Sequence, residues 1–321
     1  MEVTDYKIGD EPKILELFKL AFNQEMSVEY WRWRFLNNPV SKPMIKLMWD
    51  GETLAGHYAV SPVELIVNGD VSLTSLSMTT MTHPDYAGRG IFTTLAESLY
   101  KTIQEKFNVT AVWGFPNRNS HYGFIKNLKW KDLAAIPTLK LEVESFRRGS
   151  DENIEVIENF TTSHYSSFLS NLRKDVVSVN RTKEYLEWRY VNNPSNKYII
   201  FEVDVEDERY YAVAKTFLTS TSLDKVTEID IVELCVPTDV ELIRSLVSKV
   251  LSYYEAKNTT MITSVNLWLS QNDPKYIMAE KLGFTMEKPI TYFGIRSLES
   301  KEKHFETIHN WQFSMGDSDI Y

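Results

Sequence analysis

The chain has 321 residues, of which 43% are hydrophobic and 25% charged, with a formal net charge of −9 at pH 7. These values are typical of a soluble globular protein that is long enough for two domains. The acidic balance argues against nonspecific binding to nucleic acid and against binding to an anionic membrane surface.

The cysteine content and the N-terminal residues further limit the kinds of protein that the chain can be. The single cysteine, Cys235, excludes an internal disulfide and any cysteine-rich zinc site, and its apolar neighbours predict a buried strand position. The first residues, Met-Glu-Val-Thr-Asp-Tyr, have neither a basic nor an apolar run, so we expect no signal peptide. No stretch reaches the roughly 18 apolar residues of a membrane-spanning helix. We therefore expect a cytoplasmic protein with no metal, membrane or nucleic-acid partner.

Helical and strand periodicities alternate along the first half of the chain. The expected elements are, in order, a strand over 2–8, helices over 10–22 and 28–37, a hairpin over 45–67, a strand ending at residue 83, a helix over 91–107, a strand over 109–115, a short helix over 120–127 and a strand over 138–144. This order predicts an α/β (α+β) unit whose mixed, largely antiparallel, twisted sheet is covered by helices.

A sequence repeat divides the chain. Residues 29–39, Glu-Tyr-x-x-Trp-Arg-Phe-x-Asn-Asn-Pro, return as residues 184–194, Glu-Tyr-x-x-Trp-Arg-Tyr-x-Asn-Asn-Pro. We therefore predict two tandem copies of one fold, over residues 1–147 and 151–321, joined by a polar linker near Arg147–Ser150. The aromatic residues that both copies share are expected to be core residues, whereas Trp31 is not repeated and is the better candidate for a ligand contact.

The stretch from His83 to Phe92, His-Pro-Asp-Tyr-Ala-Gly-Arg-Gly-Ile-Phe, lies between a predicted strand and a predicted helix. Gly88 and Gly90 let the backbone turn tightly and approach a ligand closely. The following helix N-terminus attracts anions, and Arg89 adds a cation. The stretch matches neither a P-loop nor G-x-G-x-x-G. It predicts a cradle for a pyrophosphate group.

The same stretch resembles the acyl-CoA-binding motif of the GNAT-superfamily N-acyltransferases, a Gln/Arg-x-x-Gly-x-Gly/Ala loop that follows a strand. Gly90 matches the central glycine, whereas Ala87 and Phe92 depart from the usual residues. The resemblance implies two GNAT-like domains, acyl-CoA as co-substrate, and direct attack by an amine without an acyl-enzyme. In the second copy a glycine-free run follows Val236-Pro237, so we expect its cradle to be degenerate.

The resemblance also assigns site residues. The expected acyl-CoA contacts are Thr80, Met81, Thr82, His83, Gly88, Arg89, Gly90, Ile91, Phe92, Asn117, Asn119 and Tyr122. Asn117 and Asn119 would hold pantetheine amides or cap the helix. The substrate would contact Trp31, His57 and Trp113.

Three histidines are candidates for the general base, because imidazole accepts a proton near neutral pH. They are His83, His57 and His121, with an ordered water as the alternative; His83 would otherwise close the turn before Pro84, and His57 would otherwise pack in the sheet. The tyrosine that serves the family as acid falls on Ile125. Tyr122, about one helical turn earlier, is the expected substitute.

The helix carrying Trp33-Arg34 and the segment Gly114–Ser120 look like those of a GNAT subgroup of sugar N-acyltransferases. The resemblance implies that the acceptor is a nucleotide-linked amino-deoxysugar, such as a dTDP-3-amino-3,6-dideoxyhexose made for surface polysaccharide. Three alternatives stay open: another small amine (an aminoglycoside, a polyamine or a thiol-precursor amine), an aminoacyl-tRNA-dependent peptidoglycan transferase, and a non-catalytic acyl-CoA sensor. The absence of a basic run argues against the tRNA-dependent enzyme.

Overall fold

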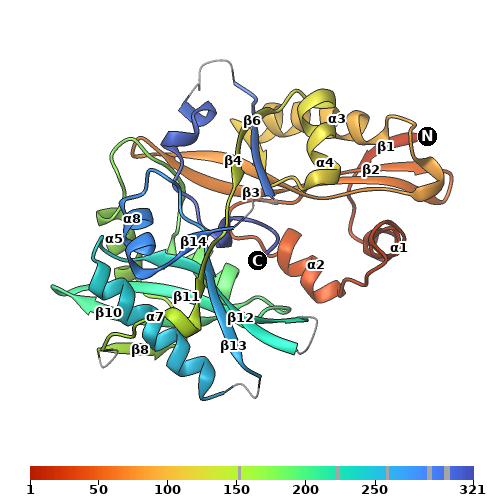
Figure 1. Ribbon diagram of the computed structural model, residues 1–321. Coiled ribbons are helices and arrows are strands. Elements are labelled where there is room, and N and C mark those ends of the chain that lie inside the picture. Colours follow the sequence, from red (N-terminus) through yellow and green to blue (C-terminus); the bar gives the residue numbers. More distant parts are fainter. Residues whose placement is uncertain (151–152, 221–224, 258–259, 288–290, 300–303) are drawn as a thin grey trace. The chain divides into compact units, whose positions relative to one another are not determined.

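The computed structural model describes residues 1–150, 153–220, 225–257, 260–287, 291–299 and 304–321 (Figure 1). The chain forms two compact units. Unit 1 comprises Met1–Ala135, Asn193–Ser195 and Thr291–Ile308, and unit 2 comprises Ile136–Asn192, Asn196–Ile290 and His309–Tyr321. None of the helices in the described part is long and apolar enough to cross a membrane.

Unit 1 contains one sheet with the strand order β1-β2-β3-β4-β5-β15-β6. β4 and β5 pair in parallel, whereas β1–β2, β2–β3, β3–β4 and β5–β15 are antiparallel. Its elements are β1 (Glu2–Asp5), α1 (Glu11–Phe22), α2 (Val28–Phe35), β2 (Met44–Asp50), β3 (Thr53–Val67), β4 (Asp70–Thr82), α3 (Ile91–Phe107), β5 (Ala111–Gly114), α4 (Arg118–Tyr122), β6 (Lys131–Ile136) and β15 (Thr291–Ser297).

Helices cover both faces of this sheet, with α3 and α4 on one face and α1 and α2 on the other (Figure 1). α3 begins after Gly90, and its apolar positions at helical spacing, Ile91, Leu95, Leu99 and Ile103, are all buried. Gly56 on β3 is required for this packing, because a Cβ there would lie 2.3 Å from Ile91 Cγ2. The first turn of α3 is thereby fixed against the sheet.

Unit 2 repeats the arrangement with the strand order β8-β10-β11-β12-β13-β7-β14. Here β12 and β13 are the parallel pair. Its elements are β7 (Leu139–Glu142), β8 (Ile154–Ile157), α5 (Thr162–Ser170), β9 (Val177–Val179), α6 (Lys183–Leu186), β10 (Ile199–Val205), β11 (Glu208–Ser220), β12 (Lys225–Cys235), α7 (Val240–Glu255), β13 (Ile262–Leu267), α8 (Pro274–Leu282) and β14 (Thr285–Met286). The mixed α/β class with two similar sheets is confirmed, and Cys235 is a buried residue at the end of β12.

One strand prediction is wrong. The strand within 138–144 does not close the first sheet, because β7 pairs with β13 and β14 in the second. Its place beside β5 is taken by β15, which is about 150 residues later in the chain and buries Phe293 and Ile295. Both are short strands with buried apolar residues two positions apart, Leu139 and Leu141 in β7 and Phe293 and Ile295 in β15, so the sequence pattern alone does not say which sheet each joins.

Candidate functional site

The site begins where β4 and β5 diverge. The two strands pair through Ser75–Val112 and Leu76–Trp113, although β4 continues to Thr82. Three residues after Leu76, the register between β3 and β4 shifts, so that Thr79 and Thr80 both lie opposite Tyr58. A β-bulge of this kind bends its strand and interrupts the ladder. The edge of β4 that faces β5 can therefore offer backbone N–H and C=O groups to an extended ligand.

The loop between β4 and α3 has the backbone of an anion cradle. Gly88 and Gly90 both have φ of 75°, a conformation that glycine adopts readily. Apart from the adjacent residues of the chain, no described atom lies within 4 Å of a Cβ built at either position. Gly90 is the N-cap of α3, and a glycine N-cap has no side chain to accept from the first-turn N–H groups. Those donors and the positive end of the helix dipole are left for a ligand.

Side chains around the loop stabilise its shape. The Arg89 guanidinium stacks 4.7 Å from the centre of the Tyr86 ring and donates to the Asp85 carbonyl at 3.2 Å. The backbone N–H of Asp85 donates to His83 Nδ1 at 3.2 Å. His83 thus closes the turn. Because its Nδ1 accepts this bond, the neutral imidazole carries its proton on Nε2, which can donate a hydrogen bond but has no lone pair to take up a proton.

The segment after β5 forms the expected short helix, which begins at Arg118. The side-chain oxygen of Asn117 accepts from the backbone N–H groups of Asn119 and Ser120 at 2.9 and 3.1 Å, so Asn117 caps α4. A π-helical turn over Gly123–Asn127 follows, and Gly123 lies beside the Phe92 ring. Tyr122, the expected acid, projects into solvent with 69% of its surface exposed.

Sequence reasoning missed two neighbours of His121. Its Nε2 lies 2.9 Å from Asp132 Oδ2 on β6, and its ring stacks on Tyr292 with 3.9 Å between ring centres. Tyr292 belongs to β15, and its N–H donates to the Pro116 carbonyl at 3.1 Å, at the end of β5. The wrong assignment of strand 138–144 hid this contact. No local motif marks either neighbour.

The three expected substrate contacts lie in the core. Trp31, His57 and Trp113 are 0%, 0% and 1% exposed. Trp31 packs on the Phe35 ring, and Trp113 Nε1 donates to Thr74 Oγ1 at 3.0 Å. These side chains pack the sheet, so we no longer assign them to substrate contact.

His57 is also a poor general base. Its Nδ1 lies 2.8 Å from the Thr79 carbonyl oxygen, which can only accept, so Nδ1 carries the proton and Nε2 the lone pair. Burial lowers the pKa of the imidazole to about 4. A base must reach the proton that it removes, and the buried Nε2 does not.

Unit 2 differs from unit 1 at the position that corresponds to Gly90. The N-cap of α7 is Asp239, whose Oδ1 accepts from the N–H groups of Glu241 and Leu242 at 2.8 and 2.9 Å. A carboxylate therefore occupies the donors that α3 leaves for a ligand. Its charge also repels phosphate.

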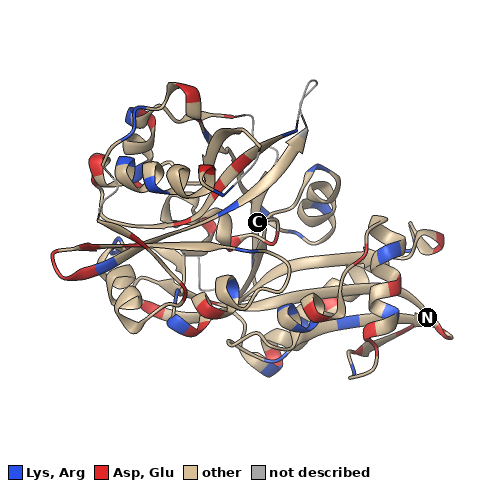
Figure 2. Ribbon diagram, turned by 90° about the horizontal axis from the view of Figure 1, so that it is seen from below, with Lys and Arg blue, Asp and Glu red and all other residues tan. Residues whose placement is uncertain are grey.

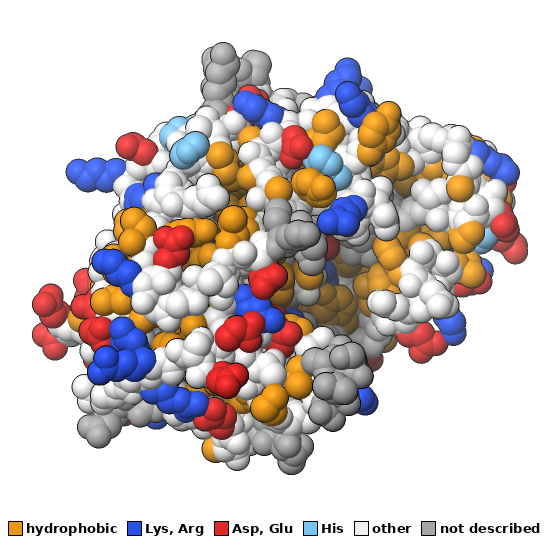
Figure 3. Space-filling view, viewed as in Figure 1, with side chains coloured by type: hydrophobic (Ala, Val, Ile, Leu, Met, Phe, Trp, Pro, Cys, Tyr) orange, Lys and Arg blue, Asp and Glu red, His pale blue; other side chains and the backbone are white. Residues whose placement is uncertain are grey.

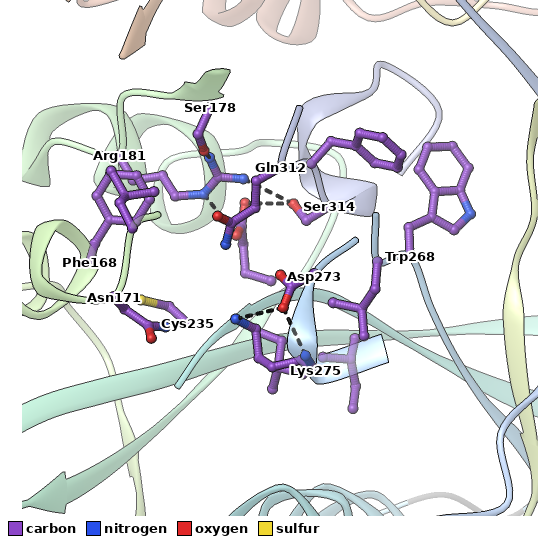
Figure 4. Close-up of a pocket in the computed structure, with 16 residues that line it drawn as sticks. Phe168, Asn171, Ser178, Arg181, Cys235, Trp268, Asp273, Lys275, Gln312 and Ser314 are labelled. Carbon is purple, nitrogen blue, oxygen red and sulfur yellow. Dashed lines mark hydrogen bonds and ion pairs between the residues drawn. The ribbon is translucent and has the colours of Figure 1, made fainter. Parts of the chain in front are cut away.

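The space at the ends of β12 and β13 is largely filled. A cavity of about 30 Å³ remains there (Figure 4). Arg181 in its wall is bonded to Glu233 at 2.9 Å and Asp317 at 2.8 Å, and Lys275 is paired with Asp273 at 3.3 Å. Burial raises the pKa of the Cys235 thiol to about 12, so it is protonated at neutral pH. The described residues of this cavity thus carry neither a thiolate nor an unpaired cation for acyl transfer.

Charge is mixed elsewhere on the molecule. Acidic and basic residues both occur along the helices, strand ends and loops in Figure 2, and the face shown in Figure 3 carries both signs among apolar side chains. The groups of unit 1 that could bind a phosphate are thus the backbone N–H groups of its loop and helix N-terminus, rather than a large basic surface.

Residues 2–131 match the family model of an acetyltransferase (GNAT) domain. No curated protein matches the chain. Among solved structures, the fold resembles a GCN5-related N-acetyltransferase from Anabaena variabilis, with a TM-score of 0.69 at 12% identity over 93% of this chain and 73% of that one. It also resembles a probable N-acyltransferase from Enterococcus faecalis, with 0.66 at 14% over 93% and 73%.

A third similar structure is Eis1 from Mycobacterium abscessus, with a TM-score of 0.61 at 13% identity over 96% of this chain and 76% of that one. At these identities the likeness concerns the fold, which is GNAT-like. The match of residues 2–131 to the acetyltransferase (GNAT) family model supports an enzyme that is an acyl-CoA-dependent N-acyltransferase.

Proposed function

We propose that this acyl-CoA-dependent N-acyltransferase binds its thioester in unit 1 and transfers the acyl group to the amine of a nucleotide-linked amino-deoxysugar. We place the acyl-CoA site in unit 1 because the two helix N-caps differ. Gly90 leaves the first-turn N–H groups of α3 available, whereas Asp239 occupies those of α7. We therefore propose one acyl-CoA site per chain, in unit 1.

The loop fits the diphosphate of CoA. The backbone N–H groups of the Gly88–Gly90 loop and of the first turn of α3 would hold the phosphates, and Arg89 would add charge beside them. The unpaired edge of β4 from Thr80 to Thr82 would hydrogen-bond the pantetheine amides. Asn117 already caps α4 through its side-chain oxygen, so only its amide N–H groups would be left for pantetheine.

The reaction needs positioning more than reactive side chains. The amine nitrogen attacks the thioester carbonyl carbon and forms the C–N bond, a backbone N–H near the β4 bulge stabilises the oxyanion, and the C–S bond then breaks. The proton leaves the amine for a water, which we propose the Nε2–H of His83 holds in place. The thiolate takes a proton from Tyr122 or from solvent.

The acceptor is proposed from sequence features that resemble those of sugar N-acyltransferases, the Trp33-Arg34 helix and the Gly114–Ser120 segment. A cationic small amine is the alternative that the acidic net charge of −9 favours. These two acceptor classes differ in charge and can be separated by one assay.

Thiol release from acetyl-CoA and longer short-chain acyl-CoAs should be measured against dTDP-amino sugars, aminoglycosides and polyamines. We expect turnover with an amino sugar. Turnover with cationic amines alone would replace the proposed acceptor. If calorimetry shows that CoA binds but no amine is acylated, the result would instead support a non-catalytic acyl-CoA sensor.

A further inference from the structure

Thr79 has a backbone conformation that needs support. Its φ is 49°, in the left-handed region that β-branched residues avoid. Such residues persist where their surroundings hold them, and they concentrate at functional sites. Thr79 lies in the β4 bulge, three residues beyond the last pair between β4 and β5. A hydrogen bond to the Thr79 carbonyl would therefore stabilise the bulge.

His57 holds this carbonyl. The imidazole donates from Nδ1 to the Thr79 oxygen at 2.8 Å, and the backbone of His57 pairs with Met81 on the far side of the bulge. The ring also packs edge-on against Phe35 of α2, with 6.3 Å between ring centres. The donor is thus fixed by the strand on one side and by a helix on the other.

The neighbouring residue fixes the opposite face of β3. The Tyr58 hydroxyl is hydrogen-bonded to Ser77 Oγ at 2.9 Å and to the Tyr100 hydroxyl at 2.6 Å. Tyr58 is the residue opposite the two bulged threonines. β3 is therefore anchored on both faces at the bulge, and among the described side chains it is His57 that bonds the left-handed residue itself.

Unit 2 supplies an internal comparison. The β11–β12 register also shifts, between Val213 and Ala214. Val213 is paired with Glu233 next to that shift, as His57 is paired with Met81, and its side chain has no hydrogen-bond donor. Within the described strand Lys225–Cys235, no residue has a positive φ. The left-handed bulge thus occurs in the unit that has both the histidine and the glycine cradle.

We propose that His57 is a positioning residue for acyl transfer: its Nδ1–H holds the Thr79 carbonyl, and the resulting bulge aims the free edge of β4 at the CoA thioester. The inference rests on the proposed function, because it gives the bulge its role in catalysis. It replaces the interpretation of His57 as the general base. His57 acts through Thr79 and does not touch the substrate.

Two variants of equal shape test the inference. Asparagine places an amide N–H near the position of imidazole Nδ1, whereas leucine has the same branching without a donor. We expect H57N to retain kcat within about threefold and H57L to lose about tenfold or more, with a similar KM for the amine, because the lost geometry concerns the transition state. The pH–rate profile of H57N should follow that of the wild type.

Hydrogen exchange of the peptide that covers Thr79–Thr82 gives a readout without substrate. Exchange should be faster in H57L than in H57N, and H57L/T79G should recover part of the lost kcat because glycine adopts a positive φ readily. Equal kcat and exchange in H57N and H57L would overturn the proposal. So would loss of the acidic limb of the pH profile in H57N, because a general base gives that limb and His57 would then be the base. If the wild type binds no CoA, the proposed function fails, while the exchange comparison still decides whether His57 holds the bulge.

Discussion

Replacing Gly90 by aspartate should convert the cradle of unit 1 into the form found in unit 2. In α7 the Asp239 carboxylate takes two backbone N–H groups at 2.8 and 2.9 Å. An aspartate at position 90 would compete for the same donors at the start of α3. It would also place a negative charge beside the diphosphate of CoA.

The electrostatic part can be estimated. Two phosphate charges at about 5 Å from a carboxylate are repelled by about 2 kcal/mol in total when the effective dielectric is near that of water, and by more when solvent is excluded. Gly90 is solvent-exposed, so the lower value applies, which corresponds to about a thirtyfold weaker Kd. Asparagine has the same size and also tolerates a positive φ, so G90N is the matched control for G90D.

Calorimetry should therefore rank CoA affinity as wild type, then G90N, then G90D, with the gap between the two variants shrinking at high salt. D239G should leave the stoichiometry at one CoA per chain. Equal Kd values for G90D and wild type would refute the assignment of the diphosphate to this loop. A second equivalent of CoA bound by the wild type would refute the assignment of a single site.

Three further predictions concern stability. Gly56→Ala puts a Cβ 2.3 Å from Ile91 Cγ2 and should lower the free energy of unfolding by about 1–3 kcal/mol in urea titrations; Gly123→Ala, whose Cβ meets Phe92 at 3.4 Å, should be near neutral. Burial raises the pKa of Asp230 from 3.8 to about 7, so the folded state holds the extra proton and stability falls as pH rises from about 4 to 7. Asp230→Asn should gain about 2–4 kcal/mol on the wild type over that range, and parallel pH curves would contradict this. Arg189 donates to the carbonyls of Gly316 and Ser318, so Arg189→Lys should destabilise unit 2 by about 1–3 kcal/mol in denaturant melts; an unchanged midpoint would mean that these bonds do not hold the segment.

Local sequence signals predicted those parts of the structure that local physics decides. The helix expected over 28–37 begins at Val28 after Ser27, which caps it by accepting from the Tyr30 N–H, and the glycines at 88 and 90 have the backbone that a tight loop requires. The repeat of Trp33 and Arg34 as Trp188 and Arg189 reflects two sheets of identical strand order. Caps, turns and repeats depend on residues close in sequence, so they can be read without the fold.

The features that were not predicted depend on pairing between residues far apart in the sequence. β7 joins the sheet of unit 2, and β15 joins the sheet of unit 1, although most of each unit comes from the other half of the chain. The contact between His121 and Tyr292 follows from that choice. The burial of Trp31 was missed because a residue that differs between the copies was assumed to face a ligand. It can equally fill a core that differs between the copies.

The two copies show how one fold can lose a ligand site while it keeps its architecture. Both sheets have the same strand order and both have a register shift beside the diverging parallel pair. They differ in single residues at two places: Gly90 against Asp239 at the helix N-cap, and His57 against Val213 beside the bulge. The strand order is the same in both sheets, although the backbone at the register shift differs: Thr79 has a positive φ, and no residue of the described strand Lys225–Cys235 does. Each difference does change which backbone N–H and C=O groups are offered to a ligand, and these are the groups that a CoA-binding site of this design would use.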